Sequence, residues 1–335
     1  MEPEPRPDLS QEQETQNEDP TNVSITLQDK LNAKLLHRID ELKARRHAVI
    51  LAHNYQPDEI QEIADFSGDS LGLSIQASQT QADVIVFCGV RFMAETAAIL
   101  SPDKTVLMPD PSAGCPMADM IEAEPLRQLK AKHPKALVVC YVNSSAEVKA
   151  ESDYCCTSAN AVEVVRSLPA DRPIIFVPDR HLGRFVQERT GRDLILWPGY
   201  CPTHQFIGEP ELRGLRDEYP QAVVMAHPEC SEPVKALADE LLSTGQMLKF
   251  VQKSPARQFI VATEIGILHA LRKARPEAQF IAASARGVCP NMKKTTLDKV
   301  VASLENMQYE VTVPAEIAIR AKRALDRMVE ILPKR

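Results

Sequence analysis

The sequence predicts an α/β protein in which three pseudo-symmetric repeats of a small parallel-sheet αβα domain surround a central active site. The first observation is a short apolar run that stops at a polar pair and occurs at residues 48–55, 136–143 and 222–229. Its β-branched residues are typical of a buried strand. The second observation is even spacing, because 88 residues separate His53 from Tyr141 and 86 separate Tyr141 from His227. Recurrence at a constant period indicates a triplicated unit.

Further landmarks recur in the same order. A small hydroxyl residue begins a helical pattern after each first strand, at Asp69-Ser70, Thr157-Ser158 and Ser243-Thr244. A second buried strand follows at residues 84–88, 173–177 and 259–263. The last apolar run of each unit leads into a Cys-Pro loop, at Cys115, Cys201 and Cys289. Alternating strands and helices predict parallel sheets, whose ligands bind beyond the carboxyl ends of the strands.

This pattern divides the chain into five segments. Residues 1–28 are polar and acidic with almost no apolar side chain, so we expect a disordered tail. The three repeats are predicted at residues 29–116, 117–202 and 203–290. Residues 291–335 are predicted to form a C-terminal helical segment that packs back on the body.

Individual elements follow from local signals. Leucines at helical spacing predict an entry helix from Leu31 to Arg46. Pro57 is expected in the first position of the next helix, and Pro314 begins the last one. In the first repeat, the remaining elements are a helix over 92–100 and a strand over 105–108. Helices are also predicted over residues 118–133, 209–219 and 294–307.

Composition restricts the function classes. With 44% hydrophobic and 25% charged residues, the chain resembles an ordinary soluble globular protein. No segment approaches 18 uninterrupted apolar residues and no basic-then-apolar leader is visible, so we expect a cytoplasmic protein without membrane contact. Most of the net charge of -7 lies in the tail, which has seven acidic residues and one arginine. The nearly neutral body argues against nucleic-acid binding.

Three of the eight cysteines recur at the same landmark, namely Cys115, Cys201 and Cys289. A structural zinc site normally has four ligands and local Cys-x2-Cys pairs, which these residues do not form. Three thiolates with one open position suit a [4Fe-4S] cluster that binds substrate as a Lewis acid. Inert loop cysteines retained through duplication are the alternative.

The recurring polar residues are candidates for substrate binding and acid/base chemistry. Ser70, Ser158 and Thr244 could simply cap helices, or they could direct three helix N-termini at a substrate with carboxylates or a phosphate. The strand-end pairs supply proton donors and acceptors: His53 with Tyr55, Tyr141 with Asn143, and His227 with Glu229. Any one of them alone could be a satisfied core polar group. His204 could orient a metal centre or bond to its own loop.

Together these residues lie in runs that resemble one known family, quinolinate synthase. The runs include ILAHNYQ, GDSLGLS, GCPMAD, YVNSSAEVKA, CTSANAVEVV, PDRHLG, YCPTHQF, AHPEC, STGQM, TEIGILH and VCPNMKK, and the match covers roughly residues 31–333. The resemblance implies three α/β (Rossmann-like) domains around one [4Fe-4S] cluster held by Cys115, Cys201 and Cys289. It also implies condensation of iminoaspartate with dihydroxyacetone phosphate to quinolinate, phosphate and two waters in NAD biosynthesis, a transferase reaction, with functional coupling to L-aspartate oxidase.

The resemblance also implies residue roles. Substrate-binding positions of the family match His53, Ser70, Tyr141, Asn143, Ser158, His227, Glu229 and Thr244, and Tyr55 matches a mobile catalytic tyrosine. We expect Glu229, with His227 beside it, to shuttle protons while Tyr55 and His53 assist. Some relatives carry Cys-x-x-Cys around the last ligand, whereas Cys289 here precedes Pro290, Asn291 and Met292, so a regulatory disulfide is not expected.

Other classes of protein share parts of this pattern. Diphthamide-synthesis proteins and the reductase of the terminal isoprenoid step use an open cluster on related layouts, but they require S-adenosylmethionine or a reductant. A non-enzymatic iron-sulfur or zinc sensor would need a DNA-binding or effector segment, and none is visible in the sequence. A purely structural repeat protein would not need matched cysteines.

Overall fold

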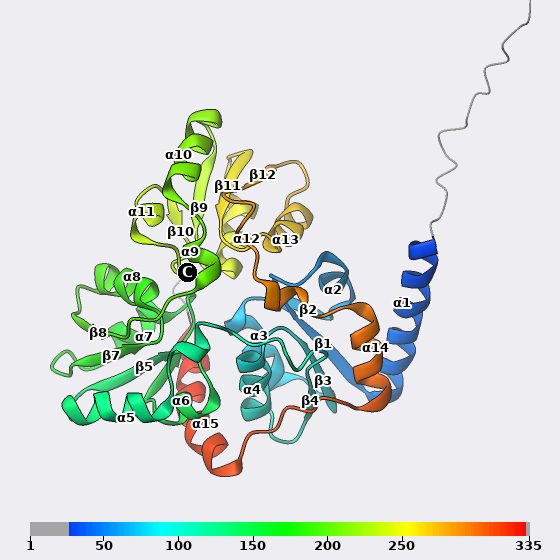
Figure 1. The fold of residues 1–335 in the computed structure, drawn as a ribbon, viewed down its shortest axis with the longest axis horizontal. Coiled ribbons are helices and arrows are strands. Elements are labelled where there is room, and N and C mark those ends of the chain that lie inside the picture. The colour runs from blue at the N-terminus through cyan, green and yellow to red at the C-terminus, as the bar shows by residue number, and fades with distance from the viewer. Residues whose placement is uncertain (1–26, 333–335) are drawn as a thin grey trace, which may run out of the picture.

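Three parallel sheets of four strands each form the protein, as the sequence predicts (Figure 1). The structure is a computed structural model that describes residues 27–332. The strand orders are β2-β1-β3-β4, β6-β5-β7-β8 and β10-β9-β11-β12, so each sheet repeats one topology. The tail predicted over residues 1–28 lies outside the described residues except for its last two, which begin the first helix.

The elements have the following bounds. The first repeat contains α1 (Leu27–Arg46), β1 (Ala48–His53), α2 (Asp58–Ile63), β2 (Phe66–Gly68), α3 (Ser70–Gln79), β3 (Val84–Cys88), α4 (Arg91–Leu100) and β4 (Thr105–Leu107). The second contains η1 (Ala118–Met120), α5 (Ala123–Lys132), β5 (Leu137–Tyr141), α6 (Ala146–Ala150), β6 (Tyr154–Cys156), α7 (Ala161–Ser167), β7 (Ile174–Val177), α8 (Arg180–Thr190) and β8 (Leu194–Leu196).

The third contains α9 (Pro202–Gln205), α10 (Glu209–Glu218), β9 (Val223–Ala226), α11 (Glu232–Lys235), β10 (Glu240–Leu241), α12 (Thr244–Lys253), β11 (Gln258–Ala262), α13 (Ile267–Ala274) and β12 (Gln279–Ala282). The chain ends with η2 (Pro290–Lys293), α14 (Leu297–Asn306) and α15 (Ala315–Glu330).

The two central strands of each sheet form its core and share one register. Ala48 of β1 pairs with Val84 of β3, Leu137 with Ile174, and Val223 with Phe259. Apolar, β-branched residues occupy these strands because helices cover both faces of a parallel sheet. The sheets therefore present their carboxyl ends in equivalent ways.

One backbone hydrogen bond recurs in all three repeats and holds the loop that carries the Cys-Pro pair. One amide after the third strand donates to a carbonyl two residues before the cysteine: Arg91 to Ala113, Arg180 to Gly199, and Ile265 to Gly287, each at 2.9 Å. The cysteine loops are thus fixed to the same edge of their sheets by the same bond.

Several predicted details are wrong. The edge strands β2, β6 and β10 have only two or three residues, so no apolar run reveals them. Pro57 precedes α2 as its N-cap instead of occupying the first helical position. The helix predicted over 118–133 is divided into η1 and α5, and the helix predicted over 294–307 begins only at Leu297, as α14.

The expected helix start at Ser158 is also wrong, because Ser158 lies in a turn and α7 begins at Ala161. Asn160 explains the delay. Its side-chain oxygen accepts from the Thr157 amide at 2.8 Å, and its nitrogen donates to the Met328 carbonyl at 3.0 Å. The Asn160 backbone therefore adopts a non-helical conformation, with φ -129°.

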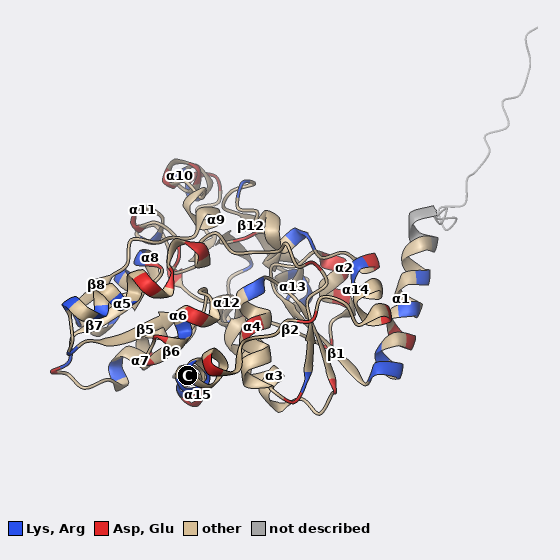
Figure 2. Ribbon diagram, turned by 60° about the horizontal axis from the view of Figure 1, so that its bottom comes forward, with Lys and Arg blue, Asp and Glu red and all other residues tan. Residues whose placement is uncertain are grey.

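Helices near the two ends of the described chain cover the assembly. The last helix, α15, packs against α6, β6 and α4 and so spans the first and second repeats (Figure 1). Helix α1 packs against α14 through a cluster that contains Ile39, Leu42 and Leu304. Figure 2 shows that basic and acidic residues are interspersed along the ribbon of the described chain. None of the described helices is long and apolar enough to cross a membrane.

Candidate active site

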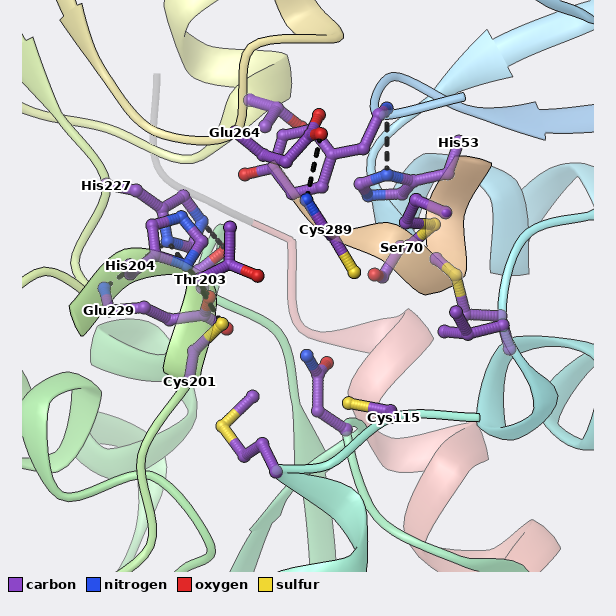
Figure 3. A pocket seen from close by; sticks show the side chains of 18 of the residues that line it. His53, Ser70, Cys115, Cys201, Thr203, His204, His227, Glu229, Glu264 and Cys289 are labelled. Atoms are coloured by element: carbon purple, nitrogen blue, oxygen red, sulfur yellow. Dashed lines mark hydrogen bonds and ion pairs between the residues drawn. The ribbon is translucent and has the colours of Figure 1, made fainter. Parts of the chain in front are cut away.

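One cavity lies where the carboxyl ends of the sheets meet, and all three repeats contribute to it (Figure 3). Its lining includes all twelve residues that the sequence singles out: His53, Tyr55, Ser70, Cys115, Tyr141, Asn143, Ser158, Cys201, His227, Glu229, Thr244 and Cys289. Residues more than 200 positions apart therefore share one space because three sheets face one another.

The three recurring cysteines point into this cavity from different repeats (Figure 3). All eight cysteines are free, so no disulfide occupies these thiols. Backbone amides of the turn that follows each cysteine favour its ionised form and so lower its pKa. These amides belong to Met117 and Ala118 for Cys115, to His204 for Cys201, and to Asn291 and Met292 for Cys289. Such amides stabilise a thiolate.

Burial opposes the charged form of the same thiols. It raises the pKa of Cys115 to about 12, and it raises the pKa of Cys201 and Cys289 as well. Three converging, buried thiolates with amide donors require a cation between them to be stable together. The donor set therefore fits a metal cluster, with soft sulfur ligands and turns arranged to hold them.

His204 connects a cysteine to an acid. Its Nδ1 lies 3.1 Å from Cys201 Sγ and 2.8 Å from Oε2 of Glu229. The three ligand atoms lie within 4.8 Å of one another, a grouping that could also hold a single metal ion. Both His204 and Glu229 are almost completely buried, so this cluster is shielded from bulk solvent.

Glu229 is held in its ionised form. The phenol of Tyr141 donates to Oε1 at 2.6 Å, and His204 contacts the other oxygen. Burial by itself raises the pKa of this carboxyl, but His204, His227 and the Tyr141 hydrogen bond outweigh burial and lower the pKa to about 2. Glu229 can therefore accept a proton only when a bound reactant changes its surroundings.

A chain of hydrogen bonds extends from His204 to the first repeat. Nε2 of His204 lies 2.8 Å from Oγ1 of Thr263, and that oxygen lies 2.5 Å from the hydroxyl of Tyr55. With the His204 proton on Nδ1, Tyr55 donates to Thr263, Thr263 donates to His204, and His204 donates to Glu229. Burial raises the pKa of Tyr55 far above its usual value, so the phenol is protonated.

His53 and His227 have the same local geometry in repeats one and three. The amide of Tyr55 donates to Nδ1 of His53 at 3.2 Å, and the amide of Glu229 donates to Nδ1 of His227 at 3.3 Å. Burial lowers the pKa of each histidine to about 3, so both are neutral with the proton on Nε2. Nε2 of His227 lies 3.1 Å from Oγ of Ser158 and donates to it, so the His227 ring orients the Ser158 hydroxyl at the cavity.

Two helices begin at the cavity, with Ser70 and Thr244 as their first residues. Between these helix ends lies the carboxylate of Asp69. It accepts from the Gly72 amide at 2.9 Å and from the Ser243 hydroxyl at 3.3 Å. An internal anion thus already offsets part of the positive potential of both helix ends.

Asn143 has an unsatisfied group. Its side-chain oxygen is buried and has no hydrogen-bond partner among the described residues. An orphaned acceptor in a cavity wall carries a desolvation cost unless a ligand supplies a donor. Asn143 is therefore suited to receive an N–H or O–H group of a substrate.

Sequence analysis missed Thr263 and Glu264, which follow β11 directly. Glu264 is fully buried, lines the cavity, and forms a 2.9 Å ion pair with Lys293. Burial raises the pKa of Glu264 although Lys293 opposes this effect. Both residues follow the third strand of their repeat, just as the polar pairs follow the first strand of each repeat. This equivalent position is the signal that could have identified them.

The chain is similar to known proteins of one family over most of its length. Residues 37–330 match the family model described as "Quinolinate synthetase A protein". The chain belongs to the quinolinate synthase family. Quinolinate synthase of Dehalococcoides mccartyi (strain CBDB1) is 57% identical over 296 residues, which are 88% of this chain and 98% of the relative.

Other members of the quinolinate synthase family show similar agreement. Quinolinate synthase of Methanosarcina barkeri is 55% identical over 299 residues, or 89% of this chain and 98% of the relative. That of Geobacter metallireducens is 57% identical over 293 residues, or 88% and 96%. The matched region contains every cavity residue named above, since they lie between positions 53 and 293.

Proposed function

We propose that the protein is a quinolinate synthase of NAD biosynthesis that condenses iminoaspartate with dihydroxyacetone phosphate. The products are quinolinate, phosphate and two waters, which makes the reaction a transferase step with two dehydrations. The observation that carries this proposal is the convergence of Cys115, Cys201 and Cys289 with an acid/base chain on one buried cavity. Family membership supports the same activity.

The proposed cofactor is one [4Fe-4S] cluster held by Cys115, Cys201 and Cys289. When bound, it would supply a Lewis acid at the iron that lacks a cysteine ligand. The amides near the three thiols support this assignment, because they favour the thiolate form by which iron-sulfur clusters are held. Cys88, by contrast, ends a buried strand and lies outside the cavity lining.

The remaining polar residues would bind the anionic substrates. Free amides at the starts of α3 and α12, beside Ser70 and Thr244, suit carboxylate or phosphate oxygens. The Nε2–H group of His53 adds a donor without adding a charge, and His227 orients the hydroxyl of Ser158. The orphaned oxygen of Asn143 suits the nitrogen or a hydroxyl of the reactants.

Protons would move through the chain of hydrogen bonds described above. Glu229 is the proposed proton acceptor, and Tyr141 and His204 stabilise its charge. Tyr55 would donate or receive a proton at the opposite end, with Thr263 and His204 completing the connection to Glu229. Isomerisation and dehydration both need such paired donors and acceptors.

We further infer that the protein works in the cytoplasm in functional coupling with L-aspartate oxidase. An imine hydrolyses readily in water, so a nearby enzyme that produces iminoaspartate would favour its capture. Neither a nucleic acid nor a membrane is a proposed partner.

Anaerobic purification followed by an assay for quinolinate tests the proposal. We expect a brown protein with about four irons per chain, which forms quinolinate from the two substrates without a reductant or S-adenosylmethionine. A requirement for either reagent would favour one of the related open-cluster enzymes. A protein that contains its cluster and forms no quinolinate would refute the proposed activity.

A further inference from the structure

The pair formed by Glu264 and Lys293 links two parts of the active site that come from different repeats. Glu264 lies two residues after β11, and its side chain is fully buried. Lys293 is the last residue of η2, the short helix that follows Cys289. Lys293 therefore lies close to the proposed cluster ligand Cys289. Glu264 directly follows Thr263, which bonds to the proposed acid/base group Tyr55.

The contacts of this pair are specific. Oε1 of Glu264 accepts from the amide of Cys289 at 3.1 Å, a bond drawn in Figure 3, and Oε2 accepts from the amide of Gly266 at 2.7 Å. Nζ of Lys293 lies 2.9 Å from Oε1 and donates to the backbone carbonyl of Tyr55 at 2.5 Å. One ion pair therefore contacts the backbone of both Cys289 and Tyr55.

We propose that Glu264 and Lys293 are positioning residues that hold Cys289 of the third repeat and Tyr55 of the first repeat in a fixed relation. The inference rests on the proposed function, in which Cys289 is a cluster ligand and Tyr55 an acid/base group. It extends that function by assigning the task of alignment to two residues that act through the backbone.

Close packing around the pair supports this role. A side-chain carbon at Gly266 would lie 2.7 Å from Nζ of Lys293 and 2.8 Å from both Oε2 of Glu264 and the Tyr55 carbonyl. Such distances are not tolerated, so only glycine leaves room for the ion pair. Gln61 reinforces the junction, because its side-chain nitrogen donates at 2.9 Å to the carbonyls of both Gly266 and Gln56.

Comparison among the repeats shows that the arrangement is not a general property of the fold. The residues that precede the three equivalent backbone donors are Val90, Asp179 and Glu264. Val90 has no polar side chain, and Oδ1 of Asp179 accepts from the Leu182 amide of its own helix at 2.7 Å. Within the described residues, only Glu264 of these three bonds to the amide of a recurring cysteine.

Chemical modification of the cluster-free protein provides the first test. The probe is iodoacetamide, and peptide mass spectrometry measures the alkylation rate of each thiol. In Lys293→Met and Glu264→Gln variants we expect Cys289 to react about tenfold faster, because its loop opens more often. The alkylation rates of Cys115 and Cys201 should equal those in the protein without substitutions.

Two further variants separate alignment from general loosening. Gly266→Ala keeps both charges but displaces the Glu264–Lys293 pair. It should therefore selectively increase the alkylation rate of Cys289 in the same way. Lys273→Met is the matched control, since Lys273 also joins the third repeat to the first through a 2.9 Å ion pair with Glu62, but at the exposed surface. The control should leave all three rates unchanged.

Kinetics of the cluster-containing enzyme provides the second test. We expect kcat of Lys293→Met to fall about tenfold to a hundredfold, as for a displaced catalytic group, with KM within about threefold. In the double variant Lys293→Met/Glu264→Gln, kcat should fall by less than the product of the two single fold-changes, because either substitution already breaks the ion pair.

The outcomes are distinguishable from failure of the proposed function. If the protein without substitutions makes no quinolinate, the proposed activity is wrong. The alkylation rates of the variants still decide the role of the Glu264–Lys293 pair. Unchanged Cys289 reactivity in all three test variants would overturn the inference. Equal acceleration of Cys115, Cys201 and Cys289 would also overturn it, since that result indicates a loosened fold instead of a local anchor.

Discussion

The hydroxyl of Tyr141 lies 2.6 Å from Oε1 of Glu229, so the second repeat donates a hydrogen bond directly to the carboxylate of the third. Both residues belong to the predicted polar pairs at the ends of the first strands, and both line the cavity. Burial raises the pKa of Glu229, but His204, His227 and the Tyr141 hydrogen bond together lower it. The acid/base chemistry therefore depends on how two repeats are docked.

Tyr141→Phe should reduce kcat by on the order of 10²-fold, because Glu229 loses a hydrogen bond that stabilises its charge. The ring remains, so packing around β5 should be preserved. Steady-state kinetics on anaerobic protein measures the loss, and iron analysis provides the control, since the iron content should not change. Full activity in this variant would show that the Tyr141 bond does not serve the reaction.

Thr263→Val should interrupt the connection between Tyr55 and His204, because valine has a similar shape but no hydroxyl. We expect kcat to fall by about tenfold to a hundredfold. Thr263→Ser restores an oxygen and should recover most of the activity. Equal activity of the valine and serine variants would contradict a role for the hydroxyl in proton transfer.

Cys115→Ala, Cys201→Ala and Cys289→Ala should each abolish both the iron-sulfur absorbance and quinolinate formation. The matched control is Cys88→Ala, which removes a fully buried thiol outside the cavity and costs about 1–3 kcal/mol of stability at most. Visible spectra and iron content per chain measure the outcome. A colourless but fully active Cys115→Ala variant would exclude the proposed cofactor.

Stability should decrease on acidification below about pH 6.5. His53 and His227 have folded-state pKa values of about 3, whereas the unfolded chain binds their protons near pH 6.5. The unfolded state therefore binds more protons as the pH falls through this window, and the free energy of unfolding decreases. Glu229 adds a further loss only below its ordinary pKa of 4.5, because its folded-state pKa is about 2.

Urea unfolding between pH 7.5 and pH 5 checks this expectation. His227→Gln should show a shallower pH dependence between pH 6.5 and pH 5, even if its stability at neutral pH is lower. His37→Gln is the control, since the His37 side chain is 78% exposed. An identical slope in His227→Gln would show that His227 does not fold in the neutral state.

Local sequence patterns were sufficient to identify the fold and the candidate residues that line its cavity. The runs before His53, Tyr141 and His227 predict buried strands because apolar periodicity records burial. The Cys-Pro loops predict three equivalent thiols because a duplicated unit keeps its landmarks. Local signals predicted the wrong helix start at Ser158. There the side chain of Asn160 bonds to the Thr157 amide, and the helix begins only at Ala161.

The sequence by itself determined the repeated α/β units, most of their elements and most of the polar residues at the carboxyl ends of their strands, because these features depend on short-range patterning. Only the tertiary structure decided which of those residues meet. The Tyr55–Thr263–His204–Glu229 chain and the contacts of Glu264 with Cys289 and of Lys293 with Tyr55 join positions far apart in the chain. The physical reason is that docking of whole sheets, which no local pattern encodes, sets these distances.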